Sequence, residues 1–230
     1  MQNEQANATC GGGASILTPV GMSEGAHAEG VYSVMCTGPL DAFRDRYLAL
    51  QERLSRSGVA GFIDRLINGS WMRKEFNAIP MELKWVDTFK NVVCKQGKNV
   101  ALDAFLSGSG YTANVYIGLM RLTGAVSADD TMASHAGWLE VGVINQPNYT
   151  GPRKAPSWGA ASAGAKATSA MSFAITGTGN VDGCFLVLGT GALSTIDNTG
   201  GFLYSVGAFT SGVQAVTPGS TLSVTYTASL

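Results

Sequence analysis

Hydrophobic and polar positions divide the chain into three stretches with different periods. Residues 1–39 show no sustained period, and short apolar pieces such as Ser15–Leu17 and Val31–Met35 stand among glycines. In residues 40–80 apolar side chains recur every three or four positions, which is the period of an amphipathic helix. From residue 81 onward, short apolar or alternating runs are separated by turns that contain Gly and Pro, which is typical of β-strands.

The clearest helical signal is an apolar stripe at 3-4-3-4 spacing near the start of the second stretch. Its members are Leu40, Phe43, Tyr47, Leu50 and Leu54. Ser57-Gly58 ends this helix, and a second short helix is expected near residues 59–67, with Asn68-Gly69 as its stop. Because two heptads are too few to make a stable helix on their own, the stripe needs another surface. We therefore predict that these five residues form a protein interface.

The third stretch predicts an all-β module with one short helix, over Lys98–Leu106. Strands are expected at Val115–Met120, Trp138–Val141, Ala167–Thr176, Cys184–Leu188, Phe202–Val206, Val213–Val216 and Leu222–Thr227. Two of them, Val115–Met120 and Cys184–Leu188, are almost continuously apolar, which indicates burial on both faces. Short strands with Gly-rich turns favour a β-sandwich or a jelly roll.

These patterns predict a mainly β protein in three parts. An extended Gly-rich arm occupies residues 1–39, short amphipathic helices occupy residues 40–80, and a β-sandwich or jelly-roll-like module occupies residues 81–230. The arm cannot by itself bury enough apolar surface to offset its chain entropy. The arm is therefore either disordered or ordered by a partner. We favour the second alternative and expect residues 1–80 to be ordered by another polypeptide.

Charge is scarce and unevenly distributed along the 230 residues. Charged residues make up 13% of the chain, against about 25% in typical soluble domains. Nineteen of them lie in residues 41–103 and only nine in residues 104–230. Such a neutral surface suits a protein that is covered by other copies or other proteins. The net charge of −1 argues against an electrostatic nucleic-acid binder, and no apolar run approaches the roughly 20 residues of a membrane span.

Candidate catalytic and metal-binding residues are few. Without a G-x-S-x-G motif, His135 is interpreted as a loop histidine that bonds its own backbone. Asp129-Asp130 has the oxygens for calcium, but capping of a turn is the favoured interpretation. Four scattered cysteines, Cys10, Cys36, Cys94 and Cys184, are interpreted as reduced and structural. We expect no enzymatic activity, no cofactor and no metal.

Three further groupings leave alternatives open. Glu140 and Asp182 are available as carboxylates for a glycan hydrolase, although nothing in their spacing supports one. Arginines of the first helix, at Arg44, Arg46, Arg53 and Arg56, have acidic neighbours, which favours a solvated or partner-facing stripe over a phosphate site. Five aromatic residues, Tyr111, Tyr116, Trp138, Tyr149 and Trp158, would make a sugar-binding platform if exposed together, but core positions are the favoured interpretation.

Several blocks within residues 82–230 resemble a family of tailed-bacteriophage virion proteins. They are Lys84-Trp85, Phe89–Val93, Gly97–Asn99, Leu102-Asp103, Leu106–Ser109, Tyr111–Ala113, Tyr116, Gly118-Leu119, Asp130–Trp138, Ala155–Trp158, Ala160–Ala170, Thr221-Leu222 and Val224–Ala228, in that order. No such resemblance extends to residues 1–80. The resemblance implies a virion structural component without a specified position in the particle.

Together, these observations favour a capsid decoration (cement) protein that binds and stabilises the outer coat through its N-terminal arm. The expected partners are the major capsid protein, further copies of the same chain, or both, in a homo-oligomer. Nucleic acid and membrane are not expected as partners. The expected location is the capsid exterior of the virion, after synthesis in the host cytoplasm. The alternative is a tail or head fibre component that contacts the host surface, where exposed aromatics would dock sugar.

Overall fold

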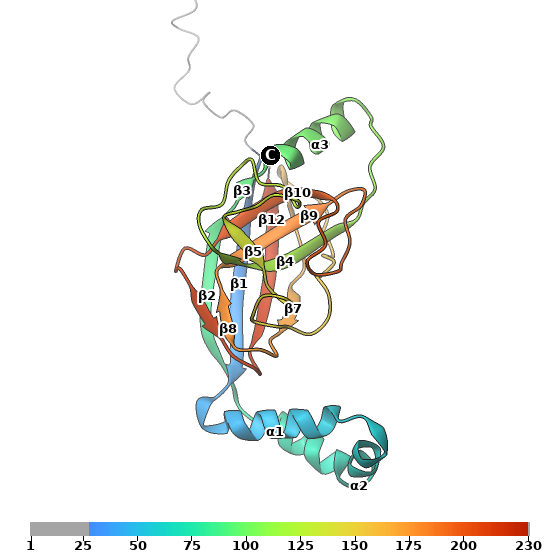
Figure 1. Ribbon diagram of the computed structural model, residues 1–230, viewed down its shortest axis with the longest axis vertical. Helices are drawn as coiled ribbons and strands as arrows, with labels where there is room; N and C mark the ends of the chain where they lie inside the picture. The colour runs from blue at the N-terminus through green and yellow to red at the C-terminus, as the bar shows by residue number, and fades with distance from the viewer. Residues whose placement is uncertain (1–27, 230) are drawn as a thin grey trace, which may run out of the picture.

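The computed structural model describes residues 28–229 and is mainly β, as the sequence predicts (Figure 1). Its strands are β1 (Glu29–Pro39), β2 (Met81–Lys90), β3 (Val92–Val93), β4 (Val115–Leu122), β5 (Trp138–Glu140), β6 (Ala165–Ala167), β7 (Met171–Ala174), β8 (Gly179–Val181), β9 (Gly183–Leu188), β10 (Phe202–Ala208), β11 (Gln214–Val216) and β12 (Thr221–Ser229). Its helices are α1 (Arg44–Ser55), preceded by a 3-10 turn (Asp41–Phe43), α2 (Gly58–Asn77) and α3 (Lys95–Leu106).

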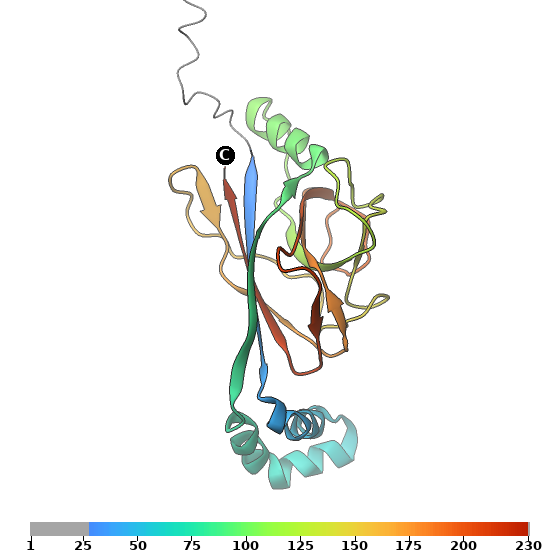
Figure 2. The same ribbon diagram turned by 90° about the vertical axis from the view of Figure 1, so that its left-hand side faces the viewer.

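Two five-stranded antiparallel sheets form the body of the molecule. The first sheet has the order β2-β1-β12-β6, with β7 also paired to β12, and the second has the order β3-β10-β9-β4-β5. A small sheet pairs β8 with β11. Figure 2 shows the two large sheets as separate layers, with α1 and α2 beyond one end of them.

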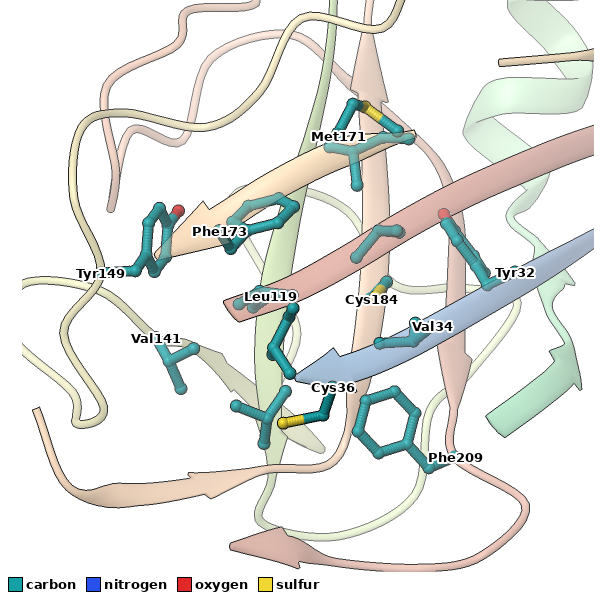
Figure 3. Close-up of a cluster of buried hydrophobic side chains, with 14 of the residues drawn as sticks. Tyr32, Val34, Cys36, Leu119, Val141, Tyr149, Met171, Phe173, Cys184 and Phe209 are labelled. Atoms are coloured by element: carbon teal, nitrogen blue, oxygen red, sulfur yellow. The ribbon is translucent and has the colours of Figure 1, made fainter. Parts of the chain in front are cut away.

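The main core fills the space between the two layers. Alternate residues of β1 point into it, because successive side chains of a strand face opposite sides of the sheet. Tyr32 and Val34 are fully buried there, opposite Leu119 and Cys184 of the second sheet (Figure 3). This alternation explains why the first sheet has a single apolar face.

The second sheet is buried on both faces. Its other side packs under loops in a second cluster that includes Trp138, Phe185 and Val187. Buried positions of β4 and β9 therefore follow one another without alternation. The prediction that these two runs are doubly buried strands is confirmed.

The prediction of an extended arm is wrong for its last twelve residues, 28–39. Residues 28–39 include β1, which lies between β2 and β12 within the first sheet. Both β2 and β12 are distant from β1 in the sequence. The pattern of residues 1–39 alone therefore gives no sign of the strands that order this segment. Residues 1–27 lie outside the described part of the chain.

The helices of residues 40–80 form a hairpin that is inserted between β1 and β2. Where the chain leaves and re-enters the sheet, the Leu40 amide donates a hydrogen bond of 3.0 Å to the Pro80 carbonyl. Helix α2 continues through the stop predicted at Asn68-Gly69 and ends at Asn77. A helical glycine costs only about 1 kcal/mol, and the residues beyond it, such as Met72, bury apolar surface that offsets this cost.

Candidate functional site

The stripe predicted as a protein interface lies instead in the hairpin's own core. Leu50 is buried with Met72 and Ile79, and Phe43, Tyr47 and Leu54 pack against this cluster. The rings of Tyr47 and Phe76 are 4.6 Å apart between centroids. Only Leu40, at the base of the hairpin, remains 37% exposed. The other surface that the stripe requires is therefore helix α2 of the same chain, and this prediction is corrected.

Polar contacts also connect the two helices. Arg53 donates two hydrogen bonds to the Asp64 carboxylate, at 2.7 and 3.1 Å, and Asn68 donates a third at 2.9 Å. These donors, Arg53 first, lower the pKa of the Asp64 carboxyl to about 2. Arg46 pairs with Glu75 in the same way. Arg46, Arg53 and Arg56 thus form ion pairs, and the interpretation of an interleaved charged stripe fits them better than a phosphate site.

The opposite side of α2 exposes a large apolar surface, which we call the outward face. Its six side chains are Val59 (77% exposed), Phe62 (60%), Ile63 (47%), Leu66 (73%), Ile67 (71%) and Trp71 (52%). Their spacing of i, i+3, i+4, i+7, i+8 and i+12 places them on one side of the helix. Met72 and the buried Gly61 and Gly69 occupy the side toward α1.

Sequence reasoning missed the outward face, although a signal was present. Helix α2 has apolar residues on more of its circumference than a single partner helix covers. The shorter helix predicted for residues 59–67 hid this excess, because Trp71, Met72 and Phe76 lay beyond its end. With these residues included, the helix has one apolar side for α1 and another that needs a further partner.

His135 and Asp130 have structural roles in one loop. The His135 ring stacks on Trp138 with centroids 3.9 Å apart, and its Nδ1 lies 2.9 Å from the Trp138 carbonyl oxygen. Asp130 accepts hydrogen bonds from the Ser127 amide, at 3.0 Å, and from Trp138 Nε1, at 3.1 Å. Both interpretations, a backbone-bonded histidine and a turn-capping aspartate, are confirmed. Within residues 28–229 no three His, Cys, Asp or Glu side chains gather as a potential metal site.

The two carboxylates considered for glycan hydrolysis are also engaged in structural contacts. Glu140 accepts two hydrogen bonds from Arg153 and a third, at 2.8 Å, from the Asp197 amide. Asp182 accepts a hydrogen bond of 2.8 Å from the Leu122 amide and is only 4% exposed. Neither residue lines the main cleft of the described structure.

Three of the four cysteines are buried free thiols. Burial raises the pKa of the Cys36 thiol to about 11 and that of Cys94 to about 12, and it raises the pKa of Cys184 further. Since the thiolate is the reactive form, these groups are inert at neutral pH. The structural interpretation is confirmed for these three, whereas Cys10 lies outside the described residues.

The five aromatic residues weighed as a sugar platform divide into two groups. Trp138 and Tyr149 are buried among core side chains, as expected. Tyr111, Tyr116 and Trp158 instead line one cleft of about 530 Å³. Tyr116 and Trp158 also pack against the core clusters, so the interpretation as core residues is wrong only for Tyr111, which is 44% exposed.

Comparison with known proteins adds no family to this description. No family model matches the chain, and neither a curated protein nor a solved structure matches it. None of the helices in residues 28–229 is both long and apolar enough to span a membrane. The outward face of α2 and the cleft are therefore the two features from which we infer a function.

Proposed function

We propose that this protein is a structural component of a phage virion, a capsid decoration protein that attaches to coat protein through the outward face of α2. The single observation that carries the proposal is the exposure of six large apolar side chains along one side of a projecting helix. Contiguous exposed apolar patches of this kind mark interaction surfaces. The resemblance of residues 82–230 to virion proteins supports the proposal that the assembly is a phage particle.

The position of the hairpin favours attachment by this face. It projects beyond the end of the two sheets that is remote from α3 (Figure 1), so a partner reaches the outward face without contacting the body of the molecule. Burial of a Leu, Ile or Phe side chain contributes about 1.5–3 kcal/mol. An amphipathic helix laid into an apolar groove is a common way to use such a row of side chains.

This proposal moves the attachment surface from the N-terminal arm to the hairpin. Residues 28–39 belong to the first sheet and are not free to lie across coat subunits. The proposed partners remain the major capsid protein and further copies of the chain, on the exterior of the particle. A jelly-roll-like order of strands likewise remains a proposal, supported by the pairing of the first strand with the last.

Incorporation of variants into virions tests the proposal. Leu66→Ser and Phe62→Ser remove apolar side chains from the outward face, while Phe105→Ser, at an equally apolar but remote position that is 87% exposed, is the matched control. We expect the two α2 variants to be lost from particles at least tenfold and the control to be incorporated normally. Normal incorporation of both α2 variants would contradict attachment through this face.

The copy number distinguishes decoration from the alternative. Quantitative mass spectrometry of purified particles should find hundreds of copies per virion if the protein covers the coat. A handful of copies would instead support a tail or head fibre component. All α2 variants should show a native circular dichroism spectrum, because the substituted side chains are exposed.

A further inference from the structure

A cleft opens between the two large sheets where their strands separate, and it is unrelated to the hairpin. Leu186 and Leu188 of β9 line it from the second sheet, and Tyr226 and Ala228 of β12 line it from the first. Its volume of about 530 Å³ lies within the range of small-molecule sites, roughly 300–1,000 Å³. The cleft is therefore an opening in the core itself.

Aromatic side chains from five separate segments form its walls, among them Tyr226 of β12. Tyr111 follows α3, Tyr116 belongs to β4, Trp158 precedes β6 and Tyr204 belongs to β10. Trp158 meets the ring of Tyr226 edge-on, with centroids 6.2 Å apart. Such walls offer flat apolar surfaces to a ligand and carry polar atoms at their edges.

The tyrosine hydroxyls supply hydrogen-bond donors at neutral pH. Burial raises the pKa of both Tyr111 and Tyr204, so neither hydroxyl ionises under these conditions. Asn114, which also lines the cleft, has an amide that both donates and accepts. The lining is thus mainly apolar with a few polar residues among it, a pattern that is common in small-molecule sites.

One exposed lysine lines the cleft and adds a positive charge to it. Lys166 of β6 lines the cleft, and its side chain forms no ion pair with any described residue. An ammonium in this position repels the quaternary amines that aromatic cages otherwise bind. It attracts a carboxylate instead.

We propose that this cleft binds an acidic oligosaccharide. The carbon–hydrogen face of a sugar ring packs against Trp158 and the tyrosines, its hydroxyls bond the tyrosine hydroxyls and Asn114, and its carboxylate pairs with Lys166. A fatty acid shares the carboxylate and the apolar character, but it makes no use of the hydroxyls around the walls. The saccharide uses all three features, and the proposal does not depend on the proposed virion function.

Calorimetric titration of the full chain tests this site with four probes. The acidic probes are a hyaluronan tetrasaccharide and an α2,8-linked disialic acid, the neutral probe is N-acetylchitotetraose, and the acyl probe is dodecanoate. We expect saturable binding of at least one acidic saccharide, and binding of N-acetylchitotetraose at least tenfold weaker. Absence of saturable binding for both acidic saccharides at millimolar concentration would overturn the proposal, as would preferential binding of dodecanoate.

Two lysine variants place the binding in the cleft. Lys166→Gln should weaken the acidic saccharide about tenfold, and the matched control Lys90→Gln, on β2 with a side chain that is 78% exposed, should leave the affinity unchanged. Chemical-shift changes should appear at the indole of Trp158 and in the segment of Tyr111. Equal effects of the two variants, or shifts confined to other parts of the chain, would overturn the assignment.

Discussion

Arg153 and Glu140 form a buried ion pair that joins strand β5 to two loops that cover the second sheet. The guanidinium of Arg153 donates two hydrogen bonds to the Glu140 carboxylate, at 2.8 and 2.6 Å, and two more to the carbonyls of Leu193 and Asn198. Their side chains are 0% and 5% exposed. The pair therefore fixes the loops that carry these residues against β4 and β5.

Removal of one member of this pair should be strongly destabilising. Arg153→Met leaves a buried carboxylate without its main partner, and we expect a loss of about 3–5 kcal/mol in the free energy of unfolding. The double variant Glu140→Leu with Arg153→Met should be more stable than Arg153→Met alone, because it removes the unpaired charge. Urea unfolding monitored by fluorescence measures both, and a loss below about 1 kcal/mol for Arg153→Met would contradict the role of the pair.

The hairpin should be dispensable for folding of the two sheets. Its core of Leu50, Met72 and Ile79 is separate from the clusters of the sheets, and the Leu40 to Pro80 hydrogen bond already closes the chain at its base. Replacement of residues 41–79 by Asn-Gly, which suits a tight β-turn, should keep a cooperative thermal transition within about 5 °C of the full chain.

The same deletion separates folding from attachment. The shortened protein should have a native β spectrum and should be absent from particles, since it lacks the outward face. A shortened protein that is aggregated or that unfolds without cooperativity would show that the sheets depend on the hairpin.

Acid should loosen the hairpin through Asp64. The pKa of this carboxyl falls from about 3.9 in an unfolded chain to about 2 in the folded one, so its stabilising effect is complete above pH 4 and disappears as the pH falls toward 2. At pH 7 Asp64→Asn should therefore increase amide hydrogen exchange in α1 and α2 relative to the unmodified chain. At pH 2 the two proteins should exchange alike, and a difference that persists there would point to another cause.

The buried cysteines should not react with thiol reagents in the native state. The raised pKa values of Cys36, Cys94 and Cys184 predict that none of these reacts with Ellman's reagent at pH 8. A Cys10→Ser variant, which leaves only these three, should show no reactive thiol before denaturation and three after it. Rapid reaction of any of them in the native variant would mean that the surrounding core opens readily.

The sequence alone predicted those strands and helices whose apolar residues follow a regular spacing within a short stretch of the chain. The continuous apolar runs of β4 and β9 indicated doubly buried strands, and the 3-4-3-4 stripe indicated helix α1, because each pattern is formed by residues that are close together in the sequence. Only part of the cleft could be predicted from the sequence. Tyr111, Tyr116 and Trp158 could be named as part of a possible platform. Tyr204 and Tyr226, which line the same cleft, could not, because they are distant from these residues in the sequence.

Pairings across long separations were decided only by the tertiary structure. Val34 of β1 lies opposite Val224 of β12. A segment that has no partner among its neighbours in the sequence thus becomes a central strand because it pairs with the last strand of the chain. Likewise, α1 and α2 each have an apolar side, but only their packing decides that α1 is covered and that the outward face of α2 remains exposed. A local pattern shows that a surface must be buried; which surface buries it depends on contacts between residues remote in the chain.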